Sequence, residues 1–250
     1  MDLNMANRQC CDLDIREYST NKPWMFADFS NTTTSGFKAD SVYAKIKGAK
    51  AIAFNNPIEG TMTCEFQCHP FKIYAMLSDG TIDTKAIVPV RKEVVCSTAG
   101  TVEVSGEAAI SGTVFVYANG DFGGTAIEGT PTITTTEGSE KTSFTATTAT
   151  DIAVDTTYLM CYLVQKTTGV SSISFNDTKI PKDYRITQET LDKDENGDLI
   201  PIKITAYKAT VQRNLDLSFS SSGDPASIKL TFDVLRDKDG NVMDMIEETA

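Results

Sequence analysis

The sequence predicts a mainly β protein, with two packed antiparallel sheets in a sandwich or barrel, one short flanking helix and a small inserted β module. Three observations lead to this fold class. Strand-like runs recur between glycines and threonines along the chain. Apolar and polar residues alternate in several of these runs, which is typical of a sheet with one buried face. Only one segment has the spacing of a helix.

The expected strands are short and regularly spaced. They are Ser41–Lys47, Ala49–Phe54, Thr61–Gln67, Gly112–Tyr117, Thr130–Thr136, Tyr158–Gln165, Val170–Asn176, Ile200–Ala209, Asn214–Ser220 and Ser227–Val234. The alternation is clearest at Leu215, Leu217 and Phe219, where polar residues separate the apolar ones. Side chains two residues apart lie on one face of a strand, so each such run predicts one core-facing side.

The single expected helix covers His69–Ser78. Pro70 stands where a first-turn proline is tolerated, and Phe71 and Tyr74 begin an apolar stripe at helical spacing. Asp79-Gly80 follows as a stop signal. A helix of this length is expected to pack against one open face of a sheet.

The middle of the chain differs in composition from its flanks. Between residues 98 and 157, 16 of 60 residues are Thr, and between 98 and 165 eight acidic residues stand against Lys141 alone. We therefore predict a Thr-rich module at residues 98–165, inserted into a discontinuous domain at residues 1–97 and 166–250. Its last run, Tyr158–Val164, resembles a closing strand of an immunoglobulin-like sandwich.

Charge and targeting features narrow the function. The chain has 250 residues, with 23 Lys and Arg against 34 Asp and Glu, a net charge of −11. Proteins that grip nucleic acid need a basic surface, so a DNA clamp is disfavoured. The start of the chain has no apolar signal-peptide core and no stretch predicts a membrane span. The six cysteines have no regular spacing and are expected to be free thiols.

Two acidic segments look at first like metal sites. Asp192–Asp198 has oxygen-bearing residues at alternate positions, but an EF-hand needs Glu at position 12, which here is Lys203. We therefore expect hairpin tips at Asn196-Gly197 and Asp239-Gly240, the second joining residues 228–235 to 242–246.

Catalytic and cofactor motifs are also missing. Cys64, Cys68 and His69 form one small thiol and imidazole cluster, but His69 is the only histidine and zinc needs three or four ligands. No phosphate-binding glycine loop occurs. No catalytic residue, metal or cofactor is predicted, and the chain is not expected to be an enzyme.

Four aromatic residues are candidate interface residues for ring stacking or subunit contacts. Trp24, Phe26 and Phe29 lie in the apparent loop Asn21–Ala39, which also contains Phe37. One interpretation is that these aromatics pack on their own domain. The other is that an arm or loop docks them on a neighbouring subunit. The sequence leaves both open.

The C-terminal third carries a family resemblance. The relevant segments are Ile180–Tyr184, Gln188–Asp192, Ile200–Lys208, Phe219–Ser227 and Thr231–Leu235, with the turn at 237–241. This series resembles the C-terminal region of tail tube (major tail) proteins of tailed bacteriophages. The Gly60–Ser78 stretch is similar to that family's strand–helix element. The resemblance covers about residues 60–78 and 170–248, and the Thr-rich module matches the family's habit of carrying immunoglobulin-like insertions.

The resemblance implies a structural virion protein. Tail tube proteins fold as two packed sheets with one helix and form homohexameric rings, in which strands join into a barrel around a channel. The rings stack through an extended loop and the chain termini. The partners are then further copies of the chain and other phage tail proteins, and DNA passes through without specific binding. A passage for DNA should repel phosphate, so we expect more Asp and Glu than Lys and Arg in the lumen.

The resemblance also implies a place, a virion tail assembled in the host bacterial cytoplasm. Two other functions stay open. One is another phage virion protein, such as a head-decoration or adhesion subunit. The other is a carbohydrate-binding β protein, which would need an export signal and an exposed aromatic platform, and the sequence reveals neither.

Overall fold

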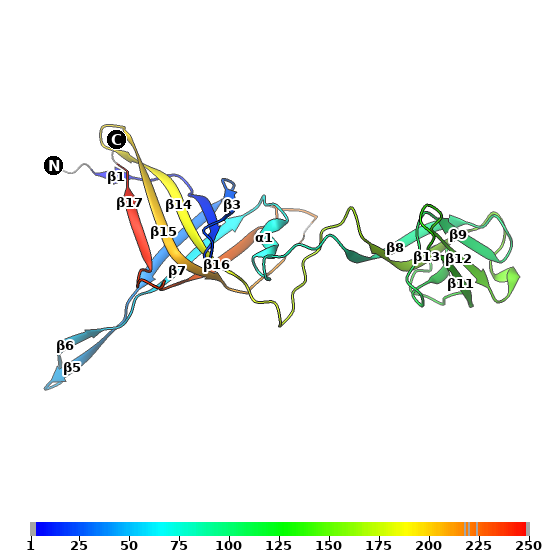
Figure 1. The fold of residues 1–250 in the computed structure, drawn as a ribbon, viewed down its shortest axis with the longest axis horizontal. Coiled ribbons are helices and arrows are strands. Elements are labelled where there is room, and N and C mark those ends of the chain that lie inside the picture. The colour runs from blue at the N-terminus through cyan, green and yellow to red at the C-terminus, as the bar shows by residue number, and fades with distance from the viewer. Residues whose placement is uncertain (1–3, 218, 220, 224, 249–250) are drawn as a thin grey trace. The chain divides into compact units, whose positions relative to one another are not determined.

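The computed structural model of the chain describes residues 4–217, 219, 221–223 and 225–248 (Figure 1). The expected fold class is confirmed, because antiparallel sheets with sandwich-like packing account for most of the structure and one α-helix is short. The chain divides into two compact units. Unit 1 comprises Met1–Ile82 and Ile173–Ala250, and unit 2 comprises Asp83–Ser172.

Unit 1 contains one large antiparallel sheet and a separate hairpin. The strands of the sheet are β1 (Met5–Ala6), β2 (Asp12–Glu17), β3 (Pro23–Ala27), β4 (Thr32–Lys38), β7 (Glu59–Phe66), β14 (Asp183–Asp194), β15 (Leu199–Val211), β16 (Ile228–Leu235) and β17 (Met243–Glu247). The main path runs β3-β2-β14-β15-β16-β7-β4, with β1 beside β14 and β17 beside β15. The separate hairpin consists of β5 (Ser41–Ile46) and β6 (Ala49–Asn55).

The large sheet curls around a single core. The backbone N–H of Cys11, just before β2, donates to Thr33 Oγ1 of β4 at 3.2 Å, although the two strands lie far apart along the sheet path. Apolar residues alternate inward from both halves of the sheet, so the curl buries them against one another. The largest fully buried side chains here are Tyr184, Phe66, Phe232, Leu13, Ile15, Met62, Ile73, Met76, Ile186 and Leu230.

The helix α1 covers Lys72–Ala75, shorter than the expected His69–Ser78. Turns with i→i+3 hydrogen bonds extend it on both sides, from Ile73 N–H to the carbonyl of Pro70 and from Ser78 N–H to that of Ala75. Gly80 closes the segment with φ of +78°, a conformation that favours glycine. Ile73 and Met76 lie in the core of unit 1, so the segment packs against the sheet as expected.

Two expected strands are wrong. Val170–Asn176 makes only an isolated bridge, between Ser172 and Asp83, and the described residues of Asn214–Ser220 form no strand. Ser218 and Ser220 lie outside the described residues. Leu217 and Phe219 are 48% and 84% exposed, so the alternation there faces no sheet partner. The opposite error occurs at Asn21–Ala39, expected as a loop, which contains β3 and β4.

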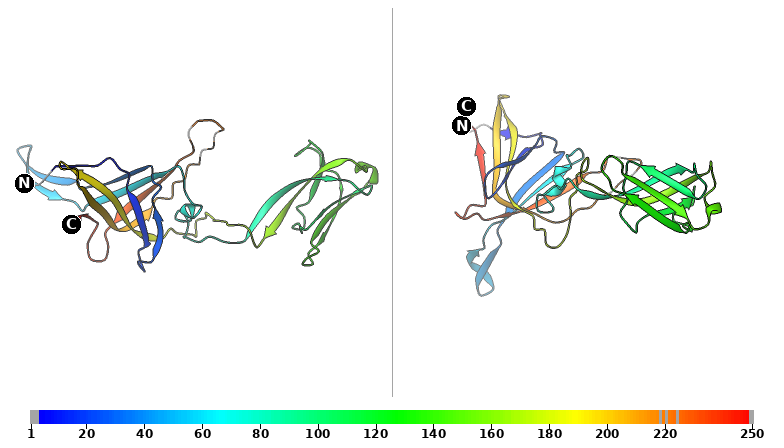
Figure 2. Two further views of the ribbon diagram at one scale, coloured as in Figure 1. Left: turned by 90° about the horizontal axis from the view of Figure 1, so that it is seen from above. Right: turned by 45° about the vertical axis from the view of Figure 1, so that its right-hand side comes forward.

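Unit 2 is a small sandwich of two three-stranded antiparallel sheets (Figure 2). One sheet has the order β10-β13-β8 and the other β11-β12-β9. Their bounds are β8 (Ala86–Val95), β9 (Thr101–Ser105), β10 (Phe115–Ala118), β11 (Gly129–Thr134), β12 (Lys141–Ala146) and β13 (Thr157–Lys166), with a 3₁₀ turn η1 (Ala149–Asp151). Val102, Val116, Phe144, Ile152 and Met160 fill the space between the sheets.

Unit 2 contains more of the chain than the module expected at residues 98–165. Strands β8 and β13 pair along ten residues, from Ala86↔Lys166 to Val95↔Thr157, so the chain from residue 83 belongs with the sandwich. Composition alone places the boundary where threonine becomes frequent, after β8. We predict that this unit folds independently.

Candidate assembly surfaces

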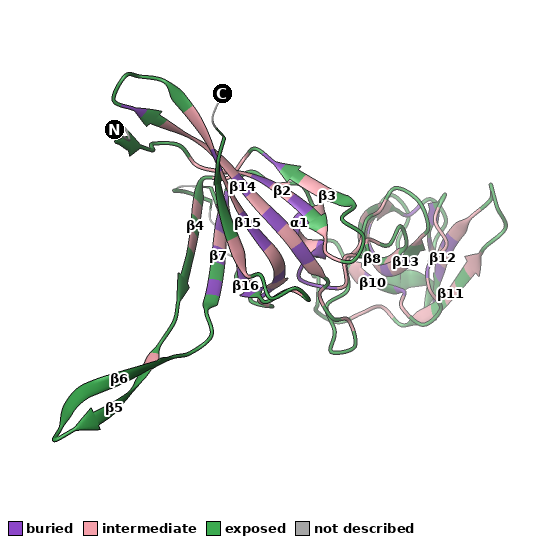
Figure 3. Cartoon of the chain, turned by 60° about the vertical axis from the view of Figure 1, so that its left-hand side comes forward, coloured by how far each residue is buried: buried purple, intermediate pink, exposed green. Residues whose placement is uncertain are grey.

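The β5–β6 hairpin is the most exposed element of unit 1. Every residue from Val42 to Asn55 is exposed, and Figure 3 shows both strands extending beyond the large sheet. Lys47 and Gly48 form the two-residue loop, with φ of +50° and +88°. Positive φ at both loop residues is typical of a type I′ turn, whose twist matches that of paired strands.

The two faces of this hairpin have opposite chemistry. Val42 pairs with Phe54 and Ala44 with Ile52, so these side chains share one face. These side chains and Ile46 form an apolar face of the hairpin. Its four large side chains are Val42 (59% exposed), Ile46 (66%), Ile52 (57%) and Phe54 (59%). The opposite face carries Tyr43, Lys45 and Lys50, and Lys50 Nζ lies 3.9 Å from the Tyr43 ring centroid. An apolar face of this size without a partner within its own unit is typical of a protein interface.

The hairpin is basic, whereas the chain is acidic. Residues 41–55 contain Lys45, Lys47 and Lys50 and no Asp or Glu, a charge of +3. Since the whole chain carries −11, the rest of the chain carries −14. The hairpin therefore has an electrostatic preference for surfaces like those found elsewhere on the same chain.

The turn between β14 and β15 forms an acidic end of unit 1. Asn196 and Gly197 lie in this turn, where Asp194 Oδ1 accepts the N–H groups of Asn196 at 2.9 Å and Asp198 at 2.8 Å, and Gly197 has φ of +95°. We define the acidic end by the carboxylates Asp192, Glu195 and Asp198, with exposed Met5 (40%) and Leu199 (59%) beside them. Exposed Lys193 lies among these carboxylates, so residues 192–198 carry four acidic residues against one basic residue. Acidic and apolar groups thus predominate here, a chemistry complementary to the β5–β6 hairpin.

The turn containing Asp239 and Gly240 is not the tip of a hairpin between its flanking strands. Among the described residues, β16 pairs with Lys208–Val211 of β15 and with β7, while β17 pairs with Ile202–Ala206 of β15. Both strands thus line one edge of β15 in succession, which the sequence pattern of a single turn could not reveal. Burial opposes ionisation of Asp237, but together the backbone N–H donors, including those of Asn241 and Asp239, lower its pKa and fix the turn.

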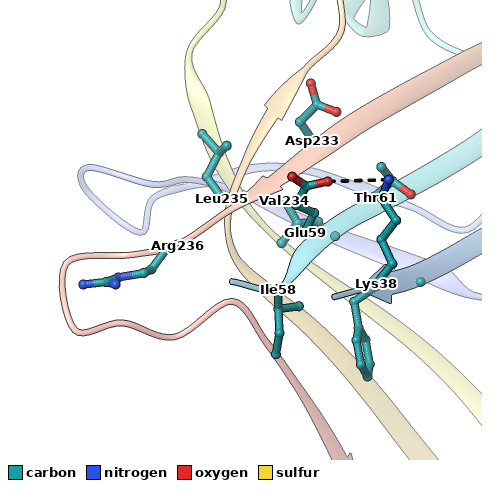
Figure 4. Close-up of a pocket in the computed structure, with 11 residues that line it drawn as sticks. Lys38, Ile58, Glu59, Thr61, Asp233, Val234, Leu235 and Arg236 are labelled. Carbon is teal, nitrogen blue, oxygen red and sulfur yellow. Dashed lines mark ion pairs between the residues drawn. The ribbon is translucent and has the colours of Figure 1, made fainter. Parts of the chain in front are cut away.

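A surface hollow lies at the base of the β5–β6 hairpin (Figure 4). Its volume is about 720 Å³. Its lining residues are Gly36, Phe37, Lys38, Ile58, Glu59, Gly60, Thr61, Asp233, Val234, Leu235 and Arg236. The Lys38 and Glu59 side chains form an exposed ion pair at 3.6 Å, and Phe37 (68%) and Ile58 (49%) are open to solvent. Phe37 and Ile58 therefore add exposed apolar surface near the base of the hairpin.

The four aromatic candidates divide into two pairs. The Trp24 ring packs 6.0 Å from Tyr184 and lies 4.1 Å from Lys72 Nζ, while Phe29 packs 5.5 Å from Phe66 in the core. Phe26 and Phe37 are 56% and 68% exposed. Trp24 and Phe29 thus contact their own unit, whereas Phe26 and Phe37 offer apolar surface to a partner. An interface role for any of the four stays a prediction.

Comparison with known protein families shows to which family the chain belongs. A family model described as YomU/Tube protein family matches residues 9–247. The chain belongs to the YomU/Tube protein family. No curated protein matches the sequence. The match spans both units, and the family's name indicates a phage tube-related structural protein and a virion component. An immunoglobulin-like character of unit 2 stays a prediction.

Other features of this YomU/Tube chain offer no competing site. Among the described residues, no three His, Cys, Asp or Glu side chains are grouped so that they could hold a metal ion. Cys64 is buried, Cys68 is exposed, and His69 Nε2 lies 3.0 Å from the Tyr74 hydroxyl, so the three do not converge. No helix in the described part of the chain is long and apolar enough to cross a membrane.

The exposed face of the β5–β6 hairpin is the functional feature that the sequence analysis missed. Both of its strands were expected, but an exposed apolar face on them was not. Two signals were present in the sequence. They are the three lysines without a carboxylate in 15 residues and the Lys47-Gly48 loop, which makes the hairpin self-contained.

Proposed function

We propose that the chain is a tail tube subunit that forms stacked hexameric rings around a channel through which the phage genome passes into the host. Its main partners are further copies of itself, together with other tail proteins. DNA passes through the channel without specific binding. The tube is assembled in the cytoplasm of the host bacterium. Membership of the YomU/Tube family and the β architecture of unit 1 support this proposal.

The exposed apolar face of the β5–β6 hairpin is the observation that carries the proposal. Full burial of a Val, Ile or Phe side chain contributes about 1.5–3 kcal/mol. Each of the four large side chains of this face is about 60% exposed, so covering one of them would contribute roughly 1–2 kcal/mol. Such a gain per contact, repeated around a ring, favours the stacking of rings.

The complementary surface on the next copy is the acidic end. Its carboxylates offset the three hairpin lysines, and Met5 and Leu199 offer apolar contact. Figures 1 and 3 show the β5–β6 hairpin and the β14–β15 turn leaving unit 1 in different directions. A contact between two different surfaces of identical chains propagates from copy to copy, as a tube requires.

Neighbours within a ring would pair through the sheet. The path of the large sheet ends at β3 and β4, each with one edge that no other strand of the described chain covers. Uncovered edges of this kind are templates for a strand of a second chain. A ring in which each subunit extends the sheet of the next would cover these edges.

Electron microscopy of the purified protein tests the proposal. We expect rings or hollow tubes, and we expect the Ile52→Ser/Phe54→Ser variant to leave rings or single subunits at protein concentrations where the unmodified chain forms tubes. Ile180→Ser is the matched control, because Ile180 is 74% exposed and lies outside the hairpin. Failure of the unmodified chain to form rings or tubes would overturn the proposed function. Normal tubes from the hairpin variant would overturn only the role of the hairpin.

A further inference from the structure

The two sheets of unit 2 present opposite outer faces. The outward side chains of β11-β12-β9 are polar and include Glu103, Thr130, Thr132, Lys141, Ser143 and Thr145. Those of β10-β13-β8 are mainly apolar and include Ile87, Pro89, Phe115, Leu159, Cys161 and Leu163. We refer to the second set as the apolar face of unit 2. In a free sandwich both outer faces meet water, so the difference between them points to a partner for one.

The geometry of the apolar face is defined by strand register. Phe115, Cys161 and Arg91 lie side by side across the three strands. Phe122 follows β10 in sequence, yet its ring lies 5.0 Å from the Arg91 guanidinium on the far strand and 6.2 Å from the Tyr117 ring. A hollow of about 530 Å³ lies among these side chains. Ile87 (60%), Phe115 (49%) and Phe122 (57%) remain exposed around it.

The chemistry of this face fits another protein surface. A carbohydrate site needs several polar groups that converge on one ligand. The apolar face offers aromatic rings but few donors, since Arg91 is the one basic residue among the outward side chains of its three strands. Unit 2 has ten acidic and five basic residues, a net charge of −5 that disfavours phosphate backbones and anionic lipids. An apolar protein surface is the remaining match.

The charges on this face are complementary to the same face of a second copy. Arg91 and Glu93 are outward neighbours on β8, and the described residues give neither of them an ion pair. In a pair related by a two-fold axis, each surface contacts its own equivalent, so Arg91 of one copy can face Glu93 of the other. The apolar face is locally neutral, whereas unit 2 as a whole is acidic and would repel a second copy elsewhere.

We propose that the apolar face of unit 2 binds the same face of unit 2 in a second copy of the chain. The ten-residue strands β8 and β13 and the four-residue strand β10 fit within about 33 by 14 Å, so the pair buries at most about 900 Å² in total. That area lies at the low end for specific interfaces, and the contact is weak between free chains. Neighbouring copies in an assembly raise the local concentration to about the millimolar range, which favours pairing. The population of the pair in the virion therefore rests on the proposed function.

Cys161 is a native reporter for this contact. It lies in the middle row of the apolar face, so the two thiols of a pair lie close to the two-fold axis. The test uses the full chain at about 1 mM, a concentration at which contacts of this size are detectable. A short bismaleimide links nearby thiols, and mass spectrometry identifies the linked peptides. We expect a Cys161–Cys161 link that Phe115→Lys reduces at least tenfold.

Two controls separate pairing from random collision. Thr132→Lys adds the same charge to the polar outer face of unit 2 and should leave the yield of the link unchanged. Links that involve exposed Cys68 measure the background in each sample. An unchanged yield in Phe115→Lys, or a Cys161 link no more frequent than the Cys68 background, overturns the pairing.

Electron microscopy of the same samples separates this inference from the proposed function. Tubes without the Cys161 link overturn the pairing alone. A specific link without rings or tubes supports the pairing and overturns the tube. Absence of both overturns both.

Discussion

The hydroxyl of Tyr162 on β13 binds Glu107 in the connection that follows β9, and its removal should weaken unit 2 alone. Tyr162 is 3% exposed and its hydroxyl donates to Glu107 Oε2 at 2.6 Å, while Lys92 Nζ lies 3.2 Å from the same oxygen. A hydrogen bond to a charged group contributes about 1.5–3 kcal/mol. The Glu107 side chain is 21% exposed, so water replaces part of the lost bond in Tyr162→Phe. We expect a loss of about 1–2 kcal/mol.

Urea unfolding with two probes measures this loss. Trp24 is the only tryptophan and lies in unit 1, so its fluorescence follows unit 1, whereas far-UV circular dichroism follows both units. With an m-value of ~1.5 kcal/mol/M for a unit of this size, Tyr162→Phe should lower the urea concentration at the unfolding midpoint of unit 2 by about 1 M. The Trp24 transition should not move. Tyr117→Phe is the control, because the Tyr117 hydroxyl has no hydrogen-bond partner in the described part of the chain.

The effect should depend on pH in a defined direction. Burial opposes ionisation of Glu107, but the hydrogen bonds from Tyr162 and Lys92 lower its pKa below the ordinary value of 4.5. A carboxyl with a lowered folded-state pKa stabilises the fold above the unfolded pKa, and this contribution is lost as pH falls through the folded value. The difference between Tyr162→Phe and the unmodified chain should therefore be largest near pH 7 and shrink below pH 4.5. Equal shifts in both probes would refute independent units, and no shift would refute the role of the hydrogen bond.

Three further outcomes are expected. Phe144 is only 3% exposed, so Phe144→Ala should lower the free energy of unfolding of unit 2 by about 3–5 kcal/mol, measured in urea. Phe37 is 68% exposed, so Phe37→Ala should change that of unit 1 by less than about 0.5 kcal/mol. Comparable losses would contradict the burial pattern. Burial raises the pKa of Cys64 to about 12, so a maleimide at pH 8 should label exposed Cys68 long before Cys64. Mass spectrometry measures both labelling rates, and equal rates would show that the core opens readily. With a net charge of −11, the purified chain should not shift the mobility of duplex DNA in a gel at ~0.1 M salt. A shift that weakens as salt is added would reveal a basic surface, which the proposed channel should lack.

The limits of sequence reasoning are clearest at two alternating segments. Leu215 and Leu217 alternate like strand residues, yet no strand of the described chain pairs with them. Asp183–Asp194 was not among the expected strands, yet it forms a twelve-residue strand because β2 and β15 pair with it on both sides. Alternation states which side chains share a face, but a strand exists only where a second backbone accepts and donates its hydrogen bonds.

In the assembly surfaces, too, local pattern and distant packing decide different features. Trp24 and Phe26 are two residues apart and both aromatic, but Trp24 packs on Tyr184 while Phe26 is 56% exposed. The sequence could not distinguish them, because the curl of the large sheet decides which aromatics it covers. The turn at Asn196-Gly197, by contrast, needed only local chemistry, since positive φ at Gly197 is a property of that residue.

By itself the sequence determined what depends on composition and nearest neighbours. It determined the β class through period-two alternation, the short helical segment through Pro70 and Gly80, the three lysines of residues 41–55 and the net charge of −11. The tertiary structure alone decided which strands pair, that unit 2 begins at Asp83, and which apolar faces stay uncovered. The physical reason is that burial is a relation between distant segments. Val42 and Phe144 have similar local patterns, and only the packing of other strands leaves one exposed and the other in a core.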